Sequence, residues 1–185
     1  MNEFLEKYYK EYYSNFKPDW LFEKLILLKE LLEQTGSNGN KVIFCGNGAS
    51  AAIASHADLD FTKQAKIKSS TFHDPALITA YSNDFGYDKS LAKLLESHMN
   101  KRDVLILISV SGESENILEA AKYAKKMGNK VISFTGKNRS NSLKEIGDIN
   151  FWVDSDAYNI VEGIHMIWIT TVIDMIIGKS VYSVS

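Results

Sequence analysis

Three serines and a glycine stand close together in the segment 109–114, which runs Ser-Val-Ser-Gly-Glu-Ser. An apolar run precedes the segment and a helical pattern follows it. Backbone N–H groups at a helix start lack partners within the helix, and the helix dipole favours an anion there. Ser109, Ser111 and Ser114 add hydroxyl donors, and Gly112 lets the backbone approach a ligand closely. The segment therefore predicts a phosphate-binding loop, and since it holds no lysine it is not a Walker A nucleotide site.

Spacing alone leaves a simpler alternative open, in which these residues only cap the helix and form its turn. A second loop, Gly-Asn-Gly-Ala-Ser at 46–50, repeats the pattern after another apolar run. Its glycines permit a tight turn, and Ser50 can cap the next helix while pointing its hydroxyl toward the same cleft. Two such loops at one sheet edge are stronger evidence for a ligand site than either loop alone.

The elements that would position these loops form an alternating series. Short apolar runs lie at 42–45, 104–108, 131–134 and 149–153, and helical patterns lie at 50–62, at 115–127 and from 159 onward. Apolar strands that alternate with helices predict a parallel sheet covered on both faces, which is a three-layer α/β fold of the Rossmann-like kind. In such sheets ligands bind beyond the carboxyl ends of the strands.

Two helical patterns precede the first strand, at 4–16 and 21–32. They hold more aromatic and leucine side chains than one narrow contact stripe needs, which indicates packing against another subunit. Packing of both helices on the chain's own sheet is an equally weighted alternative. We expect one domain over residues 1–185, with the helical segment 1–36 forming oligomer contacts.

The overall composition restricts the class of protein. The chain has 185 residues, 45% hydrophobic and 24% charged, and its net charge of −2 gives no basic footprint for nucleic acid. Charged residues interrupt the first ten positions, unlike a signal peptide. The apolar segment 164–177 is interrupted by His165 and Asp174, so we expect a buried core helix and no membrane span. With Cys45 as the only cysteine, a cytoplasmic location is expected.

Other reactive side chains have simple interpretations. Cys45 has no basic neighbour in sequence and is expected to be a buried thiol. Lys137 and Arg139 follow the third apolar run and could meet an anion, although a solvated loop is the simpler interpretation.

Three motifs resemble the sugar isomerase (SIS) domain family. They are the loop 46–50 with His56 downstream, the segment 83–87 that runs Asn-Asp-Phe-Gly-Tyr, and the serine segment 109–114. The serine segment marks SIS domains broadly, whereas the first two motifs are more particular to the phosphoheptose isomerase branch. The resemblance extends over nearly the whole chain, including the two leading helices.

The resemblance implies a five-stranded parallel sheet and a homotetramer with sites at subunit interfaces. It implies that an open-chain sugar phosphate binds there, with Asn47 and Asp84 contacting the sugar. The residues it assigns to the phosphate are Ser50, Ser109, Ser111 and Ser114. The activity it implies is aldose–ketose isomerisation of sedoheptulose 7-phosphate through an enediol, which leads to heptose precursors for lipopolysaccharide or surface glycans.

The same resemblance implies a zinc site in which a helical His-x-x-x-Glu pair is completed by a Gln and a His. Here the pair is His56 and Asp60, Glu162 stands at the Gln position and Thr170 at the His position. We expect Asp60 and Glu162 to be catalytic, and His56, Asp60 and Glu162 to be the candidate metal ligands. Asp is one methylene shorter than Glu, and Thr is not an acid or base near neutral pH, so the set departs from the family pattern.

Three functions therefore remain open. The first is the isomerase, the second is a SIS-fold protein that binds a sugar phosphate or docks a partner without catalysis, and the third is an isomerase that uses carboxylates without metal. Turnover separates the second from the others, and metal content separates the first from the third.

Overall fold

The computed structural model of the chain describes residues 1–182. The elements in this part of the chain are α1 (Asn2–Phe16), α2 (Leu21–Ser37), β1 (Val42–Gly46), α3 (Ala49–Lys63), β2 (Ser69–Thr71), α4 (Pro75–Phe85), α5 (Tyr87–His98), β3 (Val104–Ser109), α6 (Glu115–Lys126), β4 (Lys130–Thr135), α7 (Ser142–Ile146), β5 (Ile149–Trp152) and α8 (Tyr158–Ile177).

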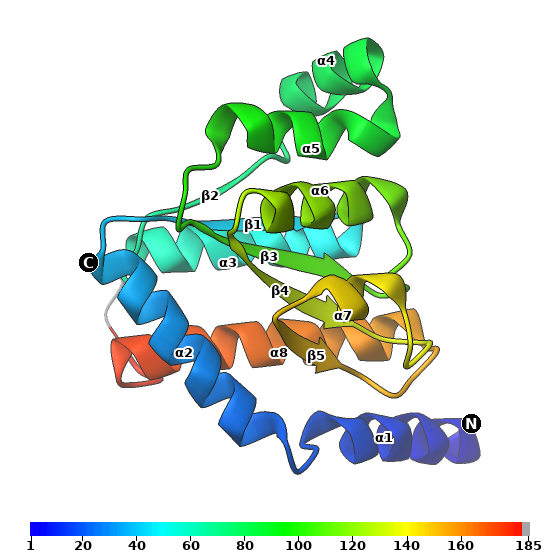
Figure 1. The fold of residues 1–185 in the computed structure, drawn as a ribbon. Helices are drawn as coiled ribbons and strands as arrows, with labels where there is room; N and C mark the ends of the chain where they lie inside the picture. Colours follow the sequence, from blue (N-terminus) through cyan, green and yellow to red (C-terminus); the bar gives the residue numbers. More distant parts are fainter. Residues whose placement is uncertain (183–185) are drawn as a thin grey trace.

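The five strands form one parallel sheet in the order β2-β1-β3-β4-β5. The arrowheads of β3, β4 and β5 point the same way in Figure 1. From β1 the chain adds β2 on one side and then crosses to β3 on the other, so the strand order reverses between β1 and β3. Gly46 at the end of β1 pairs with Ile108, next to the last residue of β3. The two predicted loops thus leave the sheet side by side at the point where ligands bind in folds of this kind.

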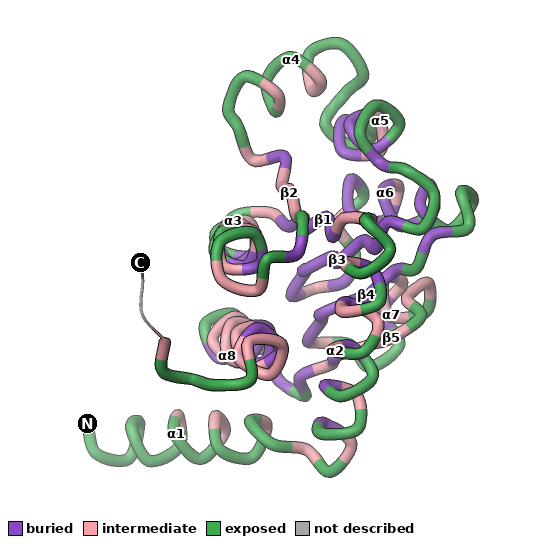
Figure 2. The backbone as a smooth tube through the Cα atoms, turned by 90° about the vertical axis from the view of Figure 1, so that its left-hand side faces the viewer, coloured by how far each residue is buried: buried purple, intermediate pink, exposed green. Residues whose placement is uncertain are grey.

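Side chains alternate between the two faces of the sheet, and each face has its own helices. On β3, Ile106 belongs to the core beneath α2, α3 and α8, whereas Leu105 and Leu107 belong to the core beneath α5, α6 and α7. Figure 2 shows α3 and α8 on one side of the sheet and α5 and α6 on the other. The prediction of a three-layer α/β fold is confirmed.

The four strands predicted from apolar runs are confirmed as β1, β3, β4 and β5. The fifth strand, β2, was implied only by the resemblance, because its Ser-Ser-Thr sequence has no apolar run. A half-buried edge strand does not need one. The helices α4, α5 and α7 were not predicted from the sequence.

The helix α8 is a core helix. Its 20 residues are long and apolar enough to cross a membrane by length and composition alone. That length exceeds the apolar segment considered above, but Ile164, Trp168 and Val172 are buried in the core shared with α2 and α3. The expectation of a buried core helix is confirmed.

The two N-terminal helices behave differently. Leu25, Leu28 and Leu32 of α2 are buried in the core, so α2 covers the sheet. In contrast, α1 has no buried residue and runs along the outside beneath α8 (Figure 2). The indole Nε1 of Trp168 on α8 donates to the carbonyl oxygen of Phe16 at 3.0 Å and anchors the end of α1.

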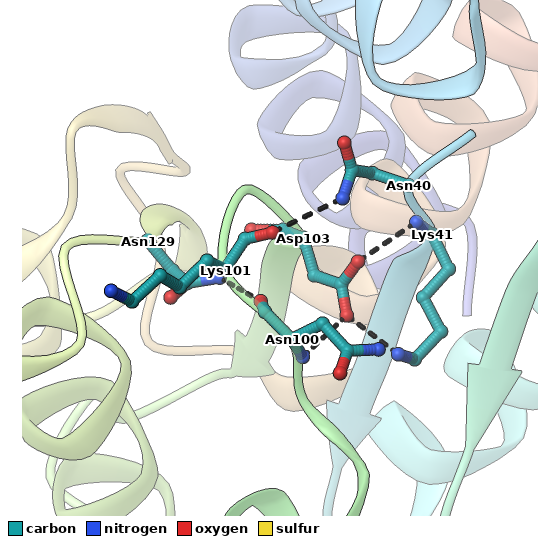
Figure 3. Close-up of polar contacts among 6 residues, drawn as sticks. All are labelled: Asn40, Lys41, Asn100, Lys101, Asp103 and Asn129. Carbon is teal, nitrogen blue, oxygen red and sulfur yellow. Dashed lines mark hydrogen bonds and ion pairs between the residues drawn. The ribbon is translucent and has the colours of Figure 1, made fainter. Parts of the chain in front are cut away.

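A polar network joins the amino ends of β1, β3 and β4 (Figure 3). The Asp103 carboxylate, 1% exposed, accepts hydrogen bonds from the backbone N–H groups of Lys41 and Asn100 at 3.0 and 2.8 Å. The Lys41 ammonium lies 2.5 Å from the same carboxylate. The Asn129 amide donates to the carbonyl oxygens of Asn100 and Asp103 at 2.7 and 2.8 Å. The network ties the starts of three neighbouring strands together.

Candidate functional site

The serine loop connects the end of β3 to the start of α6, and its hydroxyl groups make few hydrogen bonds within the described chain. Ser114 is the N-cap residue of α6, yet its side chain makes no capping hydrogen bond. The hydroxyl oxygens of Ser109 and Ser111 accept from the N–H groups of Gly112 and Glu113, each at 3.2 Å. No hydroxyl of Ser109, Ser111 or Ser114 donates to a group in residues 1–182. The alternative that the serines only cap the helix is therefore incomplete, because their donors are left for a ligand.

The predicted residues of the two loops converge on one pocket beside the carboxyl ends of β1 and β3. Its lining consists of Asn47, Ser50, Ile108, Ser109, Val110, Ser111, Ser114, Tyr158 and Glu162. All four serines predicted to hold phosphate, the predicted sugar contact Asn47 and the predicted catalytic Glu162 are in this set. Tyr158 was not predicted from the sequence, and it enters the site because α8 begins beside the loop.

The glycine loop makes its turn through backbone geometry that only glycine satisfies. A Cβ on Gly46 would lie 2.6 Å from the backbone of Ser50, so a side chain there would push the start of α3 away. Gly48 has a φ of 56° and is the N-cap residue of α3. The prediction that Ser50 caps this helix is wrong, because the left-handed turn at Gly48 starts the helix earlier and places Ser50 inside its first turn.

Asn47 is held in place by two helices. Its amide exchanges hydrogen bonds with the amide of Asn116 on α6, both at 2.9 Å. The Tyr87 hydroxyl at the start of α5 donates to Asn47 Oδ1 at 3.0 Å. Asp84, the predicted sugar contact from the same motif as Tyr87, is exposed on α4, accepts from Asn83, and does not line the pocket. Since the resemblance implies sites at subunit interfaces, the role of Asp84 stays a prediction.

The segment after β4 supports the serine loop from behind. Gly112 has a φ of 67°, and a Cβ on it would overlap the side chain of Asn141. Asn141 is fully buried and donates to the Asn138 carbonyl oxygen at 2.8 Å. The N–H of Gly136 donates to the carbonyl oxygen of Val110 at 2.9 Å. These contacts fix the loop conformation before a ligand arrives, which lowers the entropy cost of binding.

The acidic residue of the loop is turned away from this function. The Glu113 carboxylate accepts from the N–H and the hydroxyl of Ser142, at 2.9 and 2.8 Å. The adjacent N–H of Leu143 donates to the Gly112 carbonyl oxygen at 3.0 Å. Glu113 therefore ties the loop to the start of α7.

His56 and Asp60 form a pair further along α3. The distance between His56 Nε2 and Asp60 Oδ2 is 3.2 Å, as their four-residue spacing predicts. Residues advance about 1.5 Å each along a helix axis, which puts His56 about 9 Å and Asp60 about 15 Å beyond Ser50. On α8, Asp174 is close enough to Asp60 that its pKa is raised by burial and then by the Asp60 charge.

The predicted three-ligand zinc set is not assembled in the described chain. Within residues 1–182, no three His, Cys, Asp or Glu side chains come together in a group that could hold a metal ion. His56 and Asp60 form a pair on α3, whereas Glu162 belongs to α8 and lines the pocket with the serines. Since a catalytic zinc site uses three protein ligands and the resemblance implies sites at subunit interfaces, zinc binding stays a prediction.

Glu162, His165 and Thr170 of α8 differ in their ability to act as an acid or a base. Burial raises the pKa of Glu162, so this carboxyl stays protonated to a higher pH than an exposed glutamate. The Thr170 hydroxyl donates back to its own helix, to the Met166 carbonyl oxygen at 2.9 Å. His165 is fully buried, its Nε2 donates to the Thr135 carbonyl oxygen at 3.0 Å, and burial lowers its pKa to about 4. His165 is therefore a neutral structural residue.

Comparison with known proteins places this site in a family. The family model of the SIS domain matches residues 8–136. The phosphoheptose isomerase of Aliarcobacter butzleri is 34% identical over 160 residues, which is 83% of this chain and 84% of that protein. The probable phosphoheptose isomerase of Thermoplasma acidophilum is 38% identical over 162 residues, covering 83% and 85%. The structure of the phosphoheptose isomerase of Neisseria gonorrhoeae superposes with a TM-score of 0.87 at 28% identity and covers 95% of this chain and 98% of that one. The chain therefore belongs to the SIS domain family, in the branch of the phosphoheptose isomerases.

Proposed function

We propose that the protein is a phosphosugar isomerase that interconverts sedoheptulose 7-phosphate and an aldoheptose 7-phosphate. The observation that carries the proposal is the convergence of Ser50, the serine loop and Glu162 on one pocket at the reversal of the strand order. The serine hydroxyls, which donate to no group of residues 1–182, and the N–H groups at the N-terminus of α6 provide hydrogen-bond donors for the phosphate. Relatives of this branch carry the isomerase name at 34 to 38% identity.

The spacing along α3 suits a long, open-chain substrate. With the phosphate at Ser50 and the serine loop, the pair His56 and Asp60 lies about 9 to 15 Å further along the helix axis. A heptose 7-phosphate in extended form spans about 10 Å from C1 to phosphorus, with C–C bonds of about 1.5 Å. The phosphate and the isomerising carbons can therefore bind at opposite ends of one helix.

Isomerisation moves a proton between C1 and C2 and needs a base there together with an acid for the sugar oxygens. In the proposed mechanism the Asp60 carboxylate removes the proton from the carbon, with His56 at 3.2 Å to orient it. Glu162 lines the same pocket as the serines, and burial raises the pKa of its carboxyl, which favours the protonated form that we propose as the donor to a sugar oxygen.

This catalytic set departs from the one the family resemblance implies, at Asp60, Glu162 and Thr170. The Thr170 hydroxyl is engaged with its own helix and has no acid–base role. Asp174 lies one turn further and near Asp60, and it is the titratable group this stretch of α8 offers instead. The departure also supports the second candidate function, a protein that binds a sugar phosphate without turning it over.

We further propose that the protein is a cytoplasmic homo-oligomer, a tetramer by resemblance, that contributes heptose precursors to lipopolysaccharide or other surface glycans. Large apolar side chains remain exposed along α1 and α2, among them Phe4, Tyr13 and Phe22 at 68%, 72% and 56% exposure. Such a surface is unusual for a monomer and suits a second copy of the chain. Light scattering after size exclusion tests this, and a monomeric mass would contradict it.

The test of the isomerase is a phosphorus NMR time course of sedoheptulose 7-phosphate with the purified protein, with and without added zinc. A new aldoheptose phosphate resonance supports the proposal. Binding without conversion supports the second candidate function. Asp60→Asn should abolish turnover and leave phosphate binding intact, whereas Asp58→Asn, two residues away on the same helix, should retain both. Turnover by Asp60→Asn at the parent rate would remove Asp60 from the mechanism.

A further inference from the structure

The lining of the phosphate pocket has no positive charge to balance the negative charge of a bound phosphate. No lysine or arginine is among its lining residues, and its one carboxyl group is that of Glu162, whose pKa is raised by burial. A phosphate dianion bound to the serine loop would therefore meet no opposite charge among the lining side chains, and it would be repelled by Glu162 whenever that carboxyl is ionised. Hydroxyl and N–H donors orient a phosphate but carry no net charge to offset this repulsion.

A cation contacts one residue of the pocket wall. The ammonium nitrogen of Lys137 is 4.2 Å from the centroid of the Tyr158 ring, and Tyr158 lines the pocket. This geometry is a cation–π contact. Lys137 is half-buried and makes no ion pair with a carboxylate in the described residues. Residues 138–140 of the loop are exposed, in line with the expected solvated loop, whereas Lys137 at its start is half-buried and its charge is not paired with a carboxylate.

The backbone holds Lys137 at a fixed place relative to the serine loop. The preceding residue, Gly136, is hydrogen-bonded to Val110 of that loop at 2.9 Å. The Lys137 N–H donates to the Ser155 carbonyl oxygen at 3.0 Å, and its own carbonyl oxygen accepts from Trp152 Nε1 at 3.2 Å. Lys137 also has a φ of 51°, a conformation that costs free energy in a residue with a side chain.

Resting on the function proposed above, we propose that Lys137 is the counter-ion of the substrate phosphate and sets the preference for a phosphorylated over an unphosphorylated sugar. The ammonium contacts the ring of Tyr158, which lines the pocket, and the flexible lysine stem lets the ammonium turn toward the phosphate when it binds. Lys137 is a specificity-determining residue for the binding step and takes no part in proton transfer at C1 and C2.

Neighbouring cations of the same segment provide matched controls. The Lys144 ammonium lies 5.1 Å from the Trp152 ring centroid and donates to the Arg139 carbonyl oxygen at 2.8 Å. The Arg139 guanidinium lies 5.9 Å from the same ring. Trp152 is not part of the pocket lining, so these cations contribute only to the general positive field of the loop.

The test is calorimetric binding of sedoheptulose 7-phosphate and of unphosphorylated sedoheptulose at two salt concentrations, with the full-length protein. Lys137→Met should weaken binding of the phosphate by about tenfold or more, in line with a lost hydrogen bond to a charged group, and reduce its salt dependence. Lys137→Arg should retain most of the affinity, and Lys144→Met should bind as the parent does. Thermal unfolding of each variant checks folding.

Equal affinity and equal salt dependence for Lys137→Met and the parent would overturn the inference and leave the proposed function standing. An equal loss in Lys144→Met would also overturn it, because the effect would then belong to the general field. If the parent protein binds neither sugar, the proposed function fails together with the inference.

Discussion

The two edges of the sheet treat their polar groups in opposite ways. At the amino edge, the buried Asp103 carboxylate receives two backbone N–H groups and the Lys41 ammonium (Figure 3). At the carboxyl edge, the hydroxyls of Ser109, Ser111 and Ser114 donate to nothing in residues 1–182. The same strands thus begin in a closed polar network and end in an open one.

The difference separates stability from function. Buried polar groups are normally paired, because an unpaired one costs free energy. At the amino edge, the Asp103 carboxylate accepts hydrogen bonds from three donors. At the carboxyl edge, the serine hydroxyls donate to no group of the described chain, so they are available to a ligand. Loops at the carboxyl edge can also vary without disturbing the strands, whereas the amino edge holds the strands together.

The largest effect on stability should come from breaking the amino edge. Asp103→Ala removes the acceptor of three donors and leaves Lys41 without its partner, and we expect a loss of about 3–5 kcal/mol in the free energy of unfolding. Urea unfolding measures this. Lys125→Ala is the control, since the Lys125–Asp148 pair lies near the surface and should contribute at most about 1 kcal/mol. A loss below about 1 kcal/mol in Asp103→Ala would contradict the role given to the amino edge.

A second effect sharpens the comparison through pH. His165 lies beneath the carboxyl edge, with Nε2 bonded to Thr135 and Nδ1 buried without a partner among the described residues. Burial lowers its pKa to about 4, below the ordinary value of 6.5. The unfolded chain therefore binds more protons between these values, so stability is full above pH 6.5 and falls as the pH falls toward 4. We expect this effect to lower the free energy of unfolding by roughly 3 kcal/mol between pH 7 and pH 4.

His165→Gln tests this contribution, because glutamine keeps a donor for the Thr135 carbonyl oxygen and cannot titrate. The measurement is the free energy of unfolding from urea curves at pH 7, 5.5 and 4. The parent should lose more stability than the variant over this range. Identical pH slopes would show that His165 is not held neutral by the fold.

A third effect separates the two edges directly. Ser111→Ala at the carboxyl edge should weaken sugar-phosphate binding by about 1.5–3 kcal/mol, as expected for a hydrogen bond to a charged group, and lower the free energy of unfolding by at most about 1 kcal/mol through the lost Glu113 N–H contact. Ser140→Ala, in the exposed loop behind, should change neither. Titration calorimetry and urea unfolding of the same preparations give both quantities. Unchanged affinity in Ser111→Ala would remove the serine loop from phosphate binding.

The sequence predicts the fold well where burial leaves a local pattern. The apolar runs of β1, β3 and β4 follow from strands covered on both faces. The edge strand β2 has no such pattern, since its Ser-Ser-Thr residues are only half-buried. Helix α4 has no buried residue, so no buried apolar face predicts it.

The sequence predicts the two loops of the site but not the residues that hold them in place. Glycine and serine types at 46–50 and 109–114 indicate a ligand cradle by themselves. Asn116 and Tyr158 join the site through tertiary contacts, which a single sequence does not encode in its spacing. The cap predicted at Ser50 failed for a related reason, because the φ of 56° at Gly48 belongs to the three-dimensional turn.

The smallest effect concerns Glu113, which lies at the carboxyl edge but is paired like a residue of the amino edge. Its carboxylate accepts two hydrogen bonds from Ser142, and its side chain is exposed. Glu113→Gln keeps one acceptor and loses the other, so we expect a loss of about 0.5–1 kcal/mol in the free energy of unfolding. Since the change also removes a negative charge near the proposed phosphate, affinity should rise slightly at low salt.

Urea unfolding and calorimetric titration of Glu113→Gln measure both quantities, with Glu119→Gln on the outer face of α6 as the control. A small stability loss with equal or stronger binding would show that Glu113 stabilises the fold and does not bind the ligand. Whether a polar group serves stability or binding would then follow from its hydrogen-bond partners and not from the edge of the sheet at which it lies. A tenfold loss of affinity at unchanged stability would place Glu113 in the binding machinery. The open edge would then include an acidic group, and the case for Lys137 as the compensating charge would become stronger.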